Sequence, residues 1–212
     1  MRYADGCKKF IDSVIEKIQN EIVNKSTHLG FNRMIPRHVL FHMKKMIGQC
    51  NLEQVNQKLE KFELKNIPAI IVSAGPSLDK NVGELKRAQG KSFIIVVDAA
   101  LRTVLRNGIR PDMVCTIDPE SPDRFFENLN LDGLLWSCSR ITRPDVIRQF
   151  AGKIFYNGYY WGKWNQRMSE ELGYMFPILS VGGSVTSEAF QIASYLGFRK
   201  IILVGQDMAF TN

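Results

Sequence analysis

Apolar residues in the first third of the chain recur at intervals of three and four, which is the period of an amphipathic helix. One series runs from Phe10 to Ile22, and another runs from Leu40 to Cys50 and then, after a slip, from Leu52 to Phe62. The second series predicts two helices or one kinked helix beginning near Pro36, because proline is tolerated in the first turn of a helix. We therefore predict an N-terminal helical extension over residues 1–66.

After Asn66, short apolar runs alternate with helical patterns, which is typical of βαβ units. The runs that suit strands of a parallel sheet covered on both faces span residues 69–73, 93–97, 113–117, 134–137, 153–156 and 201–204. The sequence thus predicts an α/β fold in which residues 67–212 form a Rossmann-like, doubly wound, mostly parallel sheet. Because the sequence ends soon after its last predicted strand, we expect this domain to be truncated at its C-terminus.

Charge and cysteine usage narrow the classes of function. The net charge of +7 and the pI near 9.3 mildly favour anionic ligands, but basic residues cluster only in pairs, so we predict no nucleic-acid partner. The cysteines, Cys7, Cys50, Cys115 and Cys138, lack the spacing of a zinc or disulfide site and are predicted to be reduced core residues. Without a signal peptide or an apolar run near the roughly 20 residues that span a bilayer, we expect a cytoplasmic protein with no membrane partner.

The strongest local feature is the segment Ser73–Asp79, which joins the first predicted strand of the sheet to a helix. Gly75 permits close approach to the backbone, Pro76 stiffens the turn, and Ser77 would cap a helix whose free amides can receive a phosphate. This turn therefore predicts an anion site at the carboxyl edge of the sheet, where doubly wound folds bind ligands. The alternative is a tight turn with a serine cap and no ligand.

A second glycine-serine turn precedes the helix that leads to the last predicted strand. Its residues Gly183, Ser184 and Thr186 offer backbone amides and hydroxyls to an anion. We predict that the two turns converge on one ligand and that Ser77 and Ser184 both face it.

Three aspartates follow predicted strands. Asp98 lies near the position where doubly wound folds place a ribose-binding acid, and Asp118 has the chemistry to contact a ligand or a divalent cation. Asp207 follows the last strand in the segment Gly205-Gln206-Asp207, again at the edge of the sheet. For Asp98 and Asp118 a helix cap is an alternative. The predicted cofactor-binding residues are thus Gly75, Pro76, Ser77, Asp98, Asp118, Gly183, Ser184, Thr186 and Asp207, and no dedicated metal site is predicted.

Several motifs occur in order along the predicted sheet. They are Gly-Pro-Ser-Leu at 75–78, Asp-Ala-Ala-Leu at 98–101, and the segments Asn107–Asp112, Thr116–Pro119, Gly182–Thr186 and Gly205–Phe210. They resemble the bacterial motility accessory factor (Maf) family, which shares its central domain with archaeal MptE, a 6-hydroxymethylpterin diphosphokinase. The resemblance covers roughly Ile67 to Asn212. It implies a Rossmann-like domain and, for the bacterial members, transfer of CMP-activated nonulosonic acids, such as pseudaminic or legionaminic acid, onto flagellin Ser/Thr.

A more distant similarity to bacterial sialyltransferases implies that paired tyrosines assist the departing phosphate, which makes Tyr159 and Tyr160 the candidate catalytic residues. They lie in the aromatic segment 155–164, whose rings can stack on a sugar or base. The alternative for this segment is a lid or an interface patch.

The sequence departs from the sialyltransferases at the general base. Those enzymes carry a histidine shortly before the second glycine-serine turn, and no histidine occurs between Tyr156 and Gly182. The histidines present, His28, His38 and His42, lie in the N-terminal region and are predicted to be surface or interhelical residues. The sequence therefore does not reveal the base.

These observations favour a glycosyltransferase-like domain with a CMP-linked nonulosonic acid as donor and flagellin as acceptor. One alternative is an ATP-dependent 6-hydroxymethyl-7,8-dihydropterin diphosphokinase, in which acids such as Asp98, Asp118 or Asp207 would bind Mg²⁺ directly or through water. Another is a non-catalytic nucleotide-binding scaffold, which the missing base leaves open. A homo-oligomer is compatible with each of them.

Overall fold

Two units make up the chain, Met1–Arg37 and His38–Asn212. The computed structural model describes residues 14–15, 34–46, 49–148, 150, 153–159, 171, 178–179 and 183–208. The predicted helix over Phe10–Ile22 therefore lies almost entirely outside the described residues. The fold below is that of the second unit.

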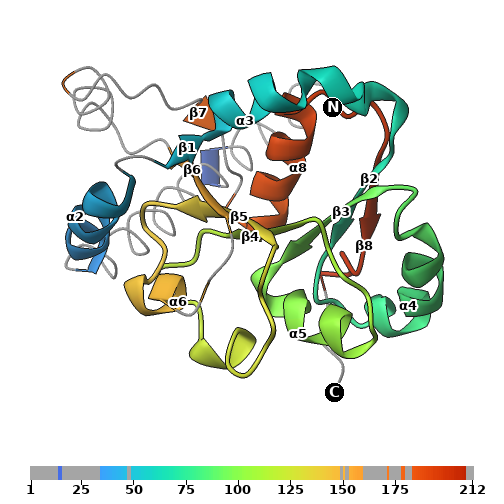
Figure 1. The fold of residues 1–212 in the computed structure, drawn as a ribbon. Helices are drawn as coiled ribbons and strands as arrows, with labels where there is room; N and C mark the ends of the chain where they lie inside the picture. The colour runs from blue at the N-terminus through green and yellow to red at the C-terminus, as the bar shows by residue number, and fades with distance from the viewer. Residues whose placement is uncertain are drawn as a thin grey trace, which may run out of the picture. The chain divides into compact units, whose positions relative to one another are not determined.

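A parallel sheet forms the centre of this unit (Figure 1). Its strands follow the order β1, β6, β5, β4, β3, β2, β8, with β7 paired to β6, and every pairing is parallel. The strands are β1 (Cys50–Asn51), β2 (Ala69–Val72), β3 (Phe93–Val97), β4 (Met113–Thr116), β5 (Leu135–Ser139), β6 (Lys153–Tyr159), β7 (Ile178–Leu179) and β8 (Ile201–Val204). The predicted fold, a Rossmann-like doubly wound sheet, is confirmed.

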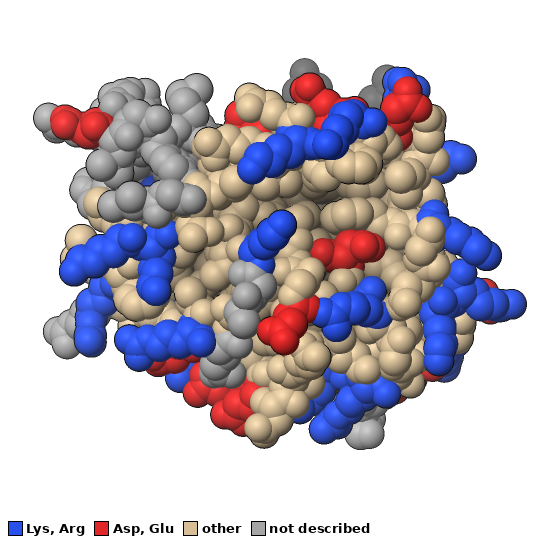
Figure 2. All heavy atoms as spheres, in the orientation of Figure 1, with Lys and Arg blue, Asp and Glu red and all other residues tan. Residues whose placement is uncertain are grey.

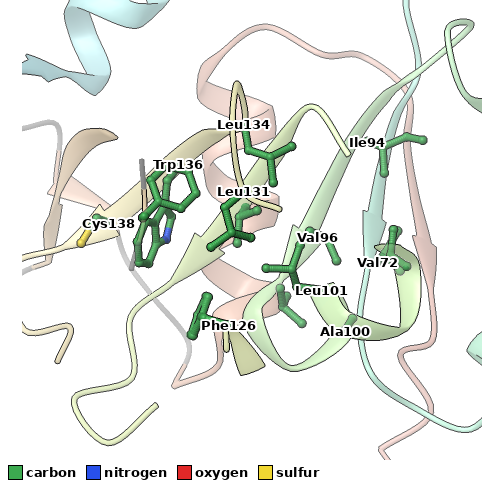
Figure 3. Close-up of a cluster of buried hydrophobic side chains, with 14 of the residues drawn as sticks. Val72, Ile94, Val96, Ala100, Leu101, Phe126, Leu131, Leu134, Trp136 and Cys138 are labelled. Carbon is green, nitrogen blue, oxygen red and sulfur yellow. The ribbon is translucent and has the colours of Figure 1, made fainter. Parts of the chain in front are cut away.

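Helices pack on both faces because alternate strand residues point to opposite sides of a sheet. On one face, strand residues such as Val72, Ile94 and Val96 belong to the same buried cluster as Leu101 of a helix and Trp136 (Figure 3). On the other face, Ile71 and Ile95 pack against Ile192. The helices are α2 (Met34–Met46), α3 (Leu52–Leu59), α4 (Ser77–Ala88), α5 (Asp98–Arg106), α6 (Pro144–Arg148) and α8 (Val185–Tyr195), with short 3-10 helices at Glu60–Phe62, Leu64–Asn66 and Asp123–Phe125.

The strand order reverses between β2 and β8. From β2 the chain adds β3, β4, β5 and β6 in one direction, and after α8 it returns to place β8 on the other side of β2. Such a switch point opens a crevice outside the carboxyl ends of the strands, and ligands of doubly wound folds bind there. The topology alone therefore predicts a ligand-binding site at the carboxyl ends of β2 and β8.

Strand β8 is less covered than the pattern predicted. It lies at one end of the described sheet, and its apolar side chains Ile202 and Leu203 are 48% and 49% exposed. A run of four apolar residues predicts full burial on both faces. The prediction holds for β2, whose residues are all buried, because Ile70 and Val72 lie in the core on one face of the sheet and Ala69 and Ile71 in the core on the other.

The compact unit starts before residue 67, the predicted start of the Rossmann-like domain. Strand β1 pairs with β6, and Leu52 and Val55 of α3 are buried in the core on the α8 face. Residues from His38 onward thus belong to the same unit as the sheet. The predicted break in the second helical series is present, since α2 ends at Met46 and α3 begins at Leu52.

Gly83 offers a direct test of helix propensity in this fold. It lies inside α4, and a Cβ added there meets nothing within 4 Å. We expect Gly83→Ala to raise the unfolding free energy by about 0.5–1 kcal/mol, because alanine loses less backbone entropy than glycine on folding. Urea denaturation followed by far-UV circular dichroism measures this change, and a decrease in stability would contradict the open surroundings of Gly83.

Candidate functional site

The ends of β2 and β8 are joined backbone to backbone. The Gly75 N–H donates to the Gly205 carbonyl at 2.8 Å, directly after the Ser73 N–H donates to the Val204 carbonyl at 2.8 Å. A Cβ on Gly75 would lie 2.4 Å from both the Gly205 carbonyl oxygen and Asp207 Oδ2. Glycine is therefore required at position 75 because the segment after β8 comes too close to leave room for a side chain. The sequence alone suggested instead the close approach of a ligand.

The carboxylate of Asp207 occupies the N-terminal end of α4. Its Oδ2 accepts a hydrogen bond from the Ser77 N–H at 2.7 Å. Hydrogen bonds from Ser77, with help from the charge of Lys80, lower the pKa of Asp207. The N-cap position belongs to Pro76 and helix α4 begins at Ser77, so the predicted serine cap is replaced by a carboxylate that follows β8. In this arrangement the Ser77 amide already has an anionic partner.

The second glycine-serine turn lies beside the first. The hydroxyl oxygens of Ser73 and Thr186 are 2.8 Å apart, which brings the end of β2 against the first turn of α8. Ser184 is the N-cap of α8 and forms a capping box, in which its Oγ accepts from the Ser187 N–H at 3.2 Å. Ser184 and Gly183 are exposed, and Gly183 has a φ of +80°. The predicted convergence of the two turns is thus present in the geometry.

Asp98 is buried and fully engaged. Its side chain is 4% exposed, and its Oδ2 accepts hydrogen bonds from the hydroxyls of Thr116 at 2.7 Å and Ser121 at 2.8 Å, while Oδ1 accepts from the Ala99 N–H at 2.8 Å. Burial raises its pKa against the opposing effect of these bonds. Asp98 therefore ties the ends of β3 and β4 together, and its ribose-binding role stays a prediction.

The remaining predicted residues are more dispersed. Asp118 is half-buried after β4, and its Oδ1 accepts from the Glu120 N–H at 2.8 Å. Tyr159 is the last residue of β6, and Tyr160 lies outside the described residues, so their catalytic role stays a prediction. Cys115 and Cys138 are buried and Cys50 is half-buried, all as free thiols, and Cys7 lies outside the described residues.

Sequence reasoning did not single out Glu188, which is 1% exposed in the first turn of α8. Its Oε1 accepts a hydrogen bond from the side-chain amide of Asn157 on β6, and that amide also donates to Ser137 Oγ on β5 at 2.6 Å. Among the described residues, no hydrogen-bond partner reaches its other oxygen, Oε2. The sequence does contain a sign of this burial. Glu188 precedes the buried Ile192 by four residues, so it lies on the apolar face of the helix.

The described histidines are buried and link α2 to β6 and to the turn after β5, whereas the sequence predicted surface or interhelical residues. Nε2 of the buried His42 donates to the Thr142 carbonyl at 2.7 Å, and its Nδ1 lies 3.2 Å from the Tyr156 hydroxyl. Nδ1 of His38 donates to the Ile141 carbonyl at 2.9 Å. Burial lowers the pKa of His42 to about 4, so the ring is neutral at pH 7.

Neither the charge on the face drawn in Figure 2 nor the metal-ligating groups of the described residues point to a further site. On the face in Figure 2, Lys and Arg side chains are spread out with Asp and Glu between them. Within the described ranges, no three His, Cys, Asp or Glu side chains gather into a group that could hold a metal ion. None of the described helices combines the length and apolar character needed to cross a bilayer.

Comparison with known proteins identifies a family for this chain. The sequence matches the family described as 6-hydroxymethylpterin diphosphokinase MptE-like over residues 42–212. Among solved structures it is similar to the Maf glycosyltransferase from Magnetospirillum magneticum AMB-1, with 25% identity, a TM-score of 0.59, and coverage of 69% of this chain and 24% of that chain. No curated protein matches the sequence. The chain therefore belongs to the MptE-like family, and the structural match relates it within that family to the Maf glycosyltransferases.

Proposed function

We propose that this chain is the nucleotide-binding domain of a glycosyltransferase that uses a CMP-linked nonulosonic acid and transfers the sugar to Ser/Thr of flagellin. The observation that carries the proposal is the Ser73–Thr186 contact at the switch point, which joins the two glycine-serine turns. Similarity to a Maf glycosyltransferase supports the reaction class. The chain spans about a quarter of that relative's length, so donor and acceptor are both part of the proposal.

We assign the binding site of the donor phosphate to the first turn of α8. The first amides of a helix have no partner within the helix, and the helix dipole favours an anion there. Helix α4 is less suited, because Asp207 already binds its Ser77 amide. Exposed Gly183 and Ser184 leave the end of α8 accessible.

In the proposed reaction, the bond between C2 of the sugar and a phosphate oxygen of CMP breaks, and the electron pair leaves with the phosphate. The acceptor hydroxyl oxygen forms the new bond to C2 and gives its proton to a base. Donors fixed at the end of α8 would stabilise the negative charge that grows on the departing phosphate. They would also hold the donor in position for attack.

The family description favours a second candidate, ATP-dependent pyrophosphoryl transfer to a pterin. Its Mg²⁺ would need acids that meet, but Asp98 is engaged by hydroxyls and Asp207 by the Ser77 amide. Oδ1 of Asp118, the third acid considered, accepts from the Glu120 N–H, and among the described residues these three acids do not gather into one group. Thermal shift assays separate the candidates: stabilisation by CMP without Mg²⁺ supports the transferase, and stabilisation only by ATP, Mg²⁺ and a pterin supports the kinase. No response to either set supports a scaffold.

A negative charge introduced at Ser184 tests the proposed phosphate-binding site. Aspartate and asparagine are both good N-cap residues, so Ser184→Asp and Ser184→Asn should each preserve α8. We expect Ser184→Asp to weaken CMP binding about tenfold or more by repelling the phosphate, and Ser184→Asn to change it less than about threefold. Isothermal titration calorimetry gives both affinities, and circular dichroism checks the fold. Equal affinities in the two variants would remove this turn from the site.

A further inference from the structure

Asp207 is an exposed carboxylate that is anchored at the switch point. It follows β8, which ends at Val204, and its Oδ2 accepts a hydrogen bond from the Ser77 N–H at 2.7 Å. The same oxygen would lie 2.4 Å from a Cβ on Gly75, so the carboxylate rests against the turn after β2. A carboxylate has about four lone-pair positions and can accept hydrogen bonds beyond those from Ser77. Asp207 is therefore an accessible acceptor at the edge of the sheet where ligands of doubly wound folds bind.

Asp98, the acid whose position in the sequence suggested a role in ribose binding, lacks this accessibility. Its side chain is 4% exposed, and both of its oxygens accept hydrogen bonds from within the protein. Asp118 is half-buried, and its Oδ1 accepts from the Glu120 N–H. Of the three aspartates that follow β3, β4 and β8, Asp207 is thus the most exposed.

The turn that carries Asp207 has an unfavourable backbone conformation. Gly205 has a φ of +71°, and Met208, which has a side chain, has a φ of +53°. Left-handed backbone is unfavourable for most residues other than glycine. Native proteins retain such residues mainly at active sites and ligand-binding sites. Because Met208 is also 92% exposed, burial of its side chain does not offset this strain. The conformation of Met208 is therefore a separate observation that favours a function for this turn.

Asp207 also lies near the proposed phosphate-binding site. Gly75, against which Asp207 rests, is two residues from Ser73, and the hydroxyl oxygens of Ser73 and Thr186 are 2.8 Å apart. Two residues span at most about 7 Å of backbone. A ligand whose phosphate binds at the first turn of α8 therefore brings the groups next to that phosphate toward Asp207. In a nucleoside monophosphate, the group next to the phosphate is the ribose.

We propose that the carboxylate of Asp207 binds the ribose of the nucleotide by accepting hydrogen bonds from its hydroxyls on C2′ and C3′. This inference rests on the proposed function and adds selectivity for ribonucleotides over deoxyribonucleotides. Hydrogen bonds from Ser77 lower the pKa of Asp207, so the group is ionised at neutral pH and can only accept. An ionised carboxylate attracts hydroxyl donors and repels phosphate, so it suits the ribose rather than the phosphate.

The preference for CMP over its deoxy analogues tests this inference. The analogues, dCMP and 3′-deoxy-CMP, each lack one of the two hydroxyls. We expect the wild type to bind at least one of them about tenfold or more weakly than CMP, the loss typical of a hydrogen bond to a charged group. In Asp207→Asn this preference should fall below about threefold, because a hydrogen bond to a neutral amide is about half as strong. All three ligands carry the same phosphate, so a change in charge repulsion cancels in the ratio. Isothermal titration calorimetry gives the affinities.

Asp79→Asn is the matched control. Asp79 is exposed in the first turn of α4, so this change removes a carboxylate from the same end of that helix. The preference for CMP should remain that of the wild type. Both variants should keep the circular dichroism spectrum of the wild type, because asparagine at position 207 retains an oxygen for the Ser77 amide.

Three results would overturn the inference and leave the proposed function standing. The first is equal affinity of the wild type for CMP and both analogues, a result that requires no variant to fold. The second is a preference for CMP that persists in Asp207→Asn. The third is a change confined to the preference for CMP over UMP, which would mean that Asp207 contacts the base. If the wild type bound none of these ligands, the proposed nucleotide would be wrong and the inference would fail with it.

Discussion

Replacing Gly205 by alanine is expected to lower the unfolding free energy by about 2–5 kcal/mol. Gly205 has a φ of +71°, and a Cβ there would lie 2.1 Å from the Ser73 carbonyl oxygen and 3.3 Å from Leu78 Cβ. The left-handed backbone costs about 1–2 kcal/mol for a residue with a side chain. Forcing β2 and β8 apart adds about 1–3 kcal/mol. Denaturation in urea, followed by circular dichroism, measures the sum.

Gly90 is the matched control for this substitution. Its φ is +78°, close to that of Gly205, but a Cβ there meets nothing within 4 Å. Gly90→Ala should therefore lose only the backbone contribution of about 1–2 kcal/mol. Similar losses in the two variants would show that the close approach of β8 to β2 contributes nothing to stability. CMP binding should also weaken in Gly205→Ala alone, because only that change disturbs the switch point.

Acidification is expected to destabilise the protein through His42. Its pKa is about 4 in the folded protein, below the ordinary value of 6.5. Between these values the unfolded chain takes up a proton that the folded protein does not, so the unfolding free energy rises with pH. The contribution of His42 is complete above pH 6.5 and is lost as the pH falls toward 4. Its size is about 3 kcal/mol, from about 1.4 kcal/mol for each pKa unit.

The buried acids act in the opposite direction over the same range, so a single pH profile does not isolate His42. Raised pKa values for Asp98 and Glu188 mean that the folded protein holds protons which the unfolded chain releases as the pH rises. Subtracting the profile of His42→Gln from that of the wild type cancels these shared contributions. The difference should fall by about 3 kcal/mol between pH 6.5 and 4. A flat difference would contradict a neutral, buried His42.

Much of the sheet was predictable because local composition decides it. The strands at 93–97 and 201–204 have the predicted limits, since continuous runs of β-branched residues leave little choice of structure. Strands β1 and β7 were not predicted, because each has two residues and no periodicity to read. Cys50 and Asn51 become a strand only through pairing with Phe155 and Tyr156, which is a tertiary effect.

The two turns of the candidate site were predictable from the sequence, but the side chains that contact or lie near them were not. Glycine and serine between a strand and a helix mark both turns, and the contact between Ser73 and Thr186 confirms that they meet. The carboxylate at the end of α4 was not foreseeable, because Asp207 is 130 residues away from Ser77 in the chain. The burial of Glu188 was also missed, since a glutamate in a first helical turn is usually solvated.

The position of β8 has a consequence for how the protein is made. Strand β2 pairs on one side with β3, which follows it closely, and on the other with β8, which is synthesised about 130 residues later, since Ala69 pairs with Ile201. Until β8 has been synthesised, one edge of β2 has no paired strand, and the crevice between the ends of β2 and β8 is incomplete. Pairings between such distant segments form slowly. Ligand recognition in this crevice is therefore expected only after β8 has been synthesised and has paired with β2.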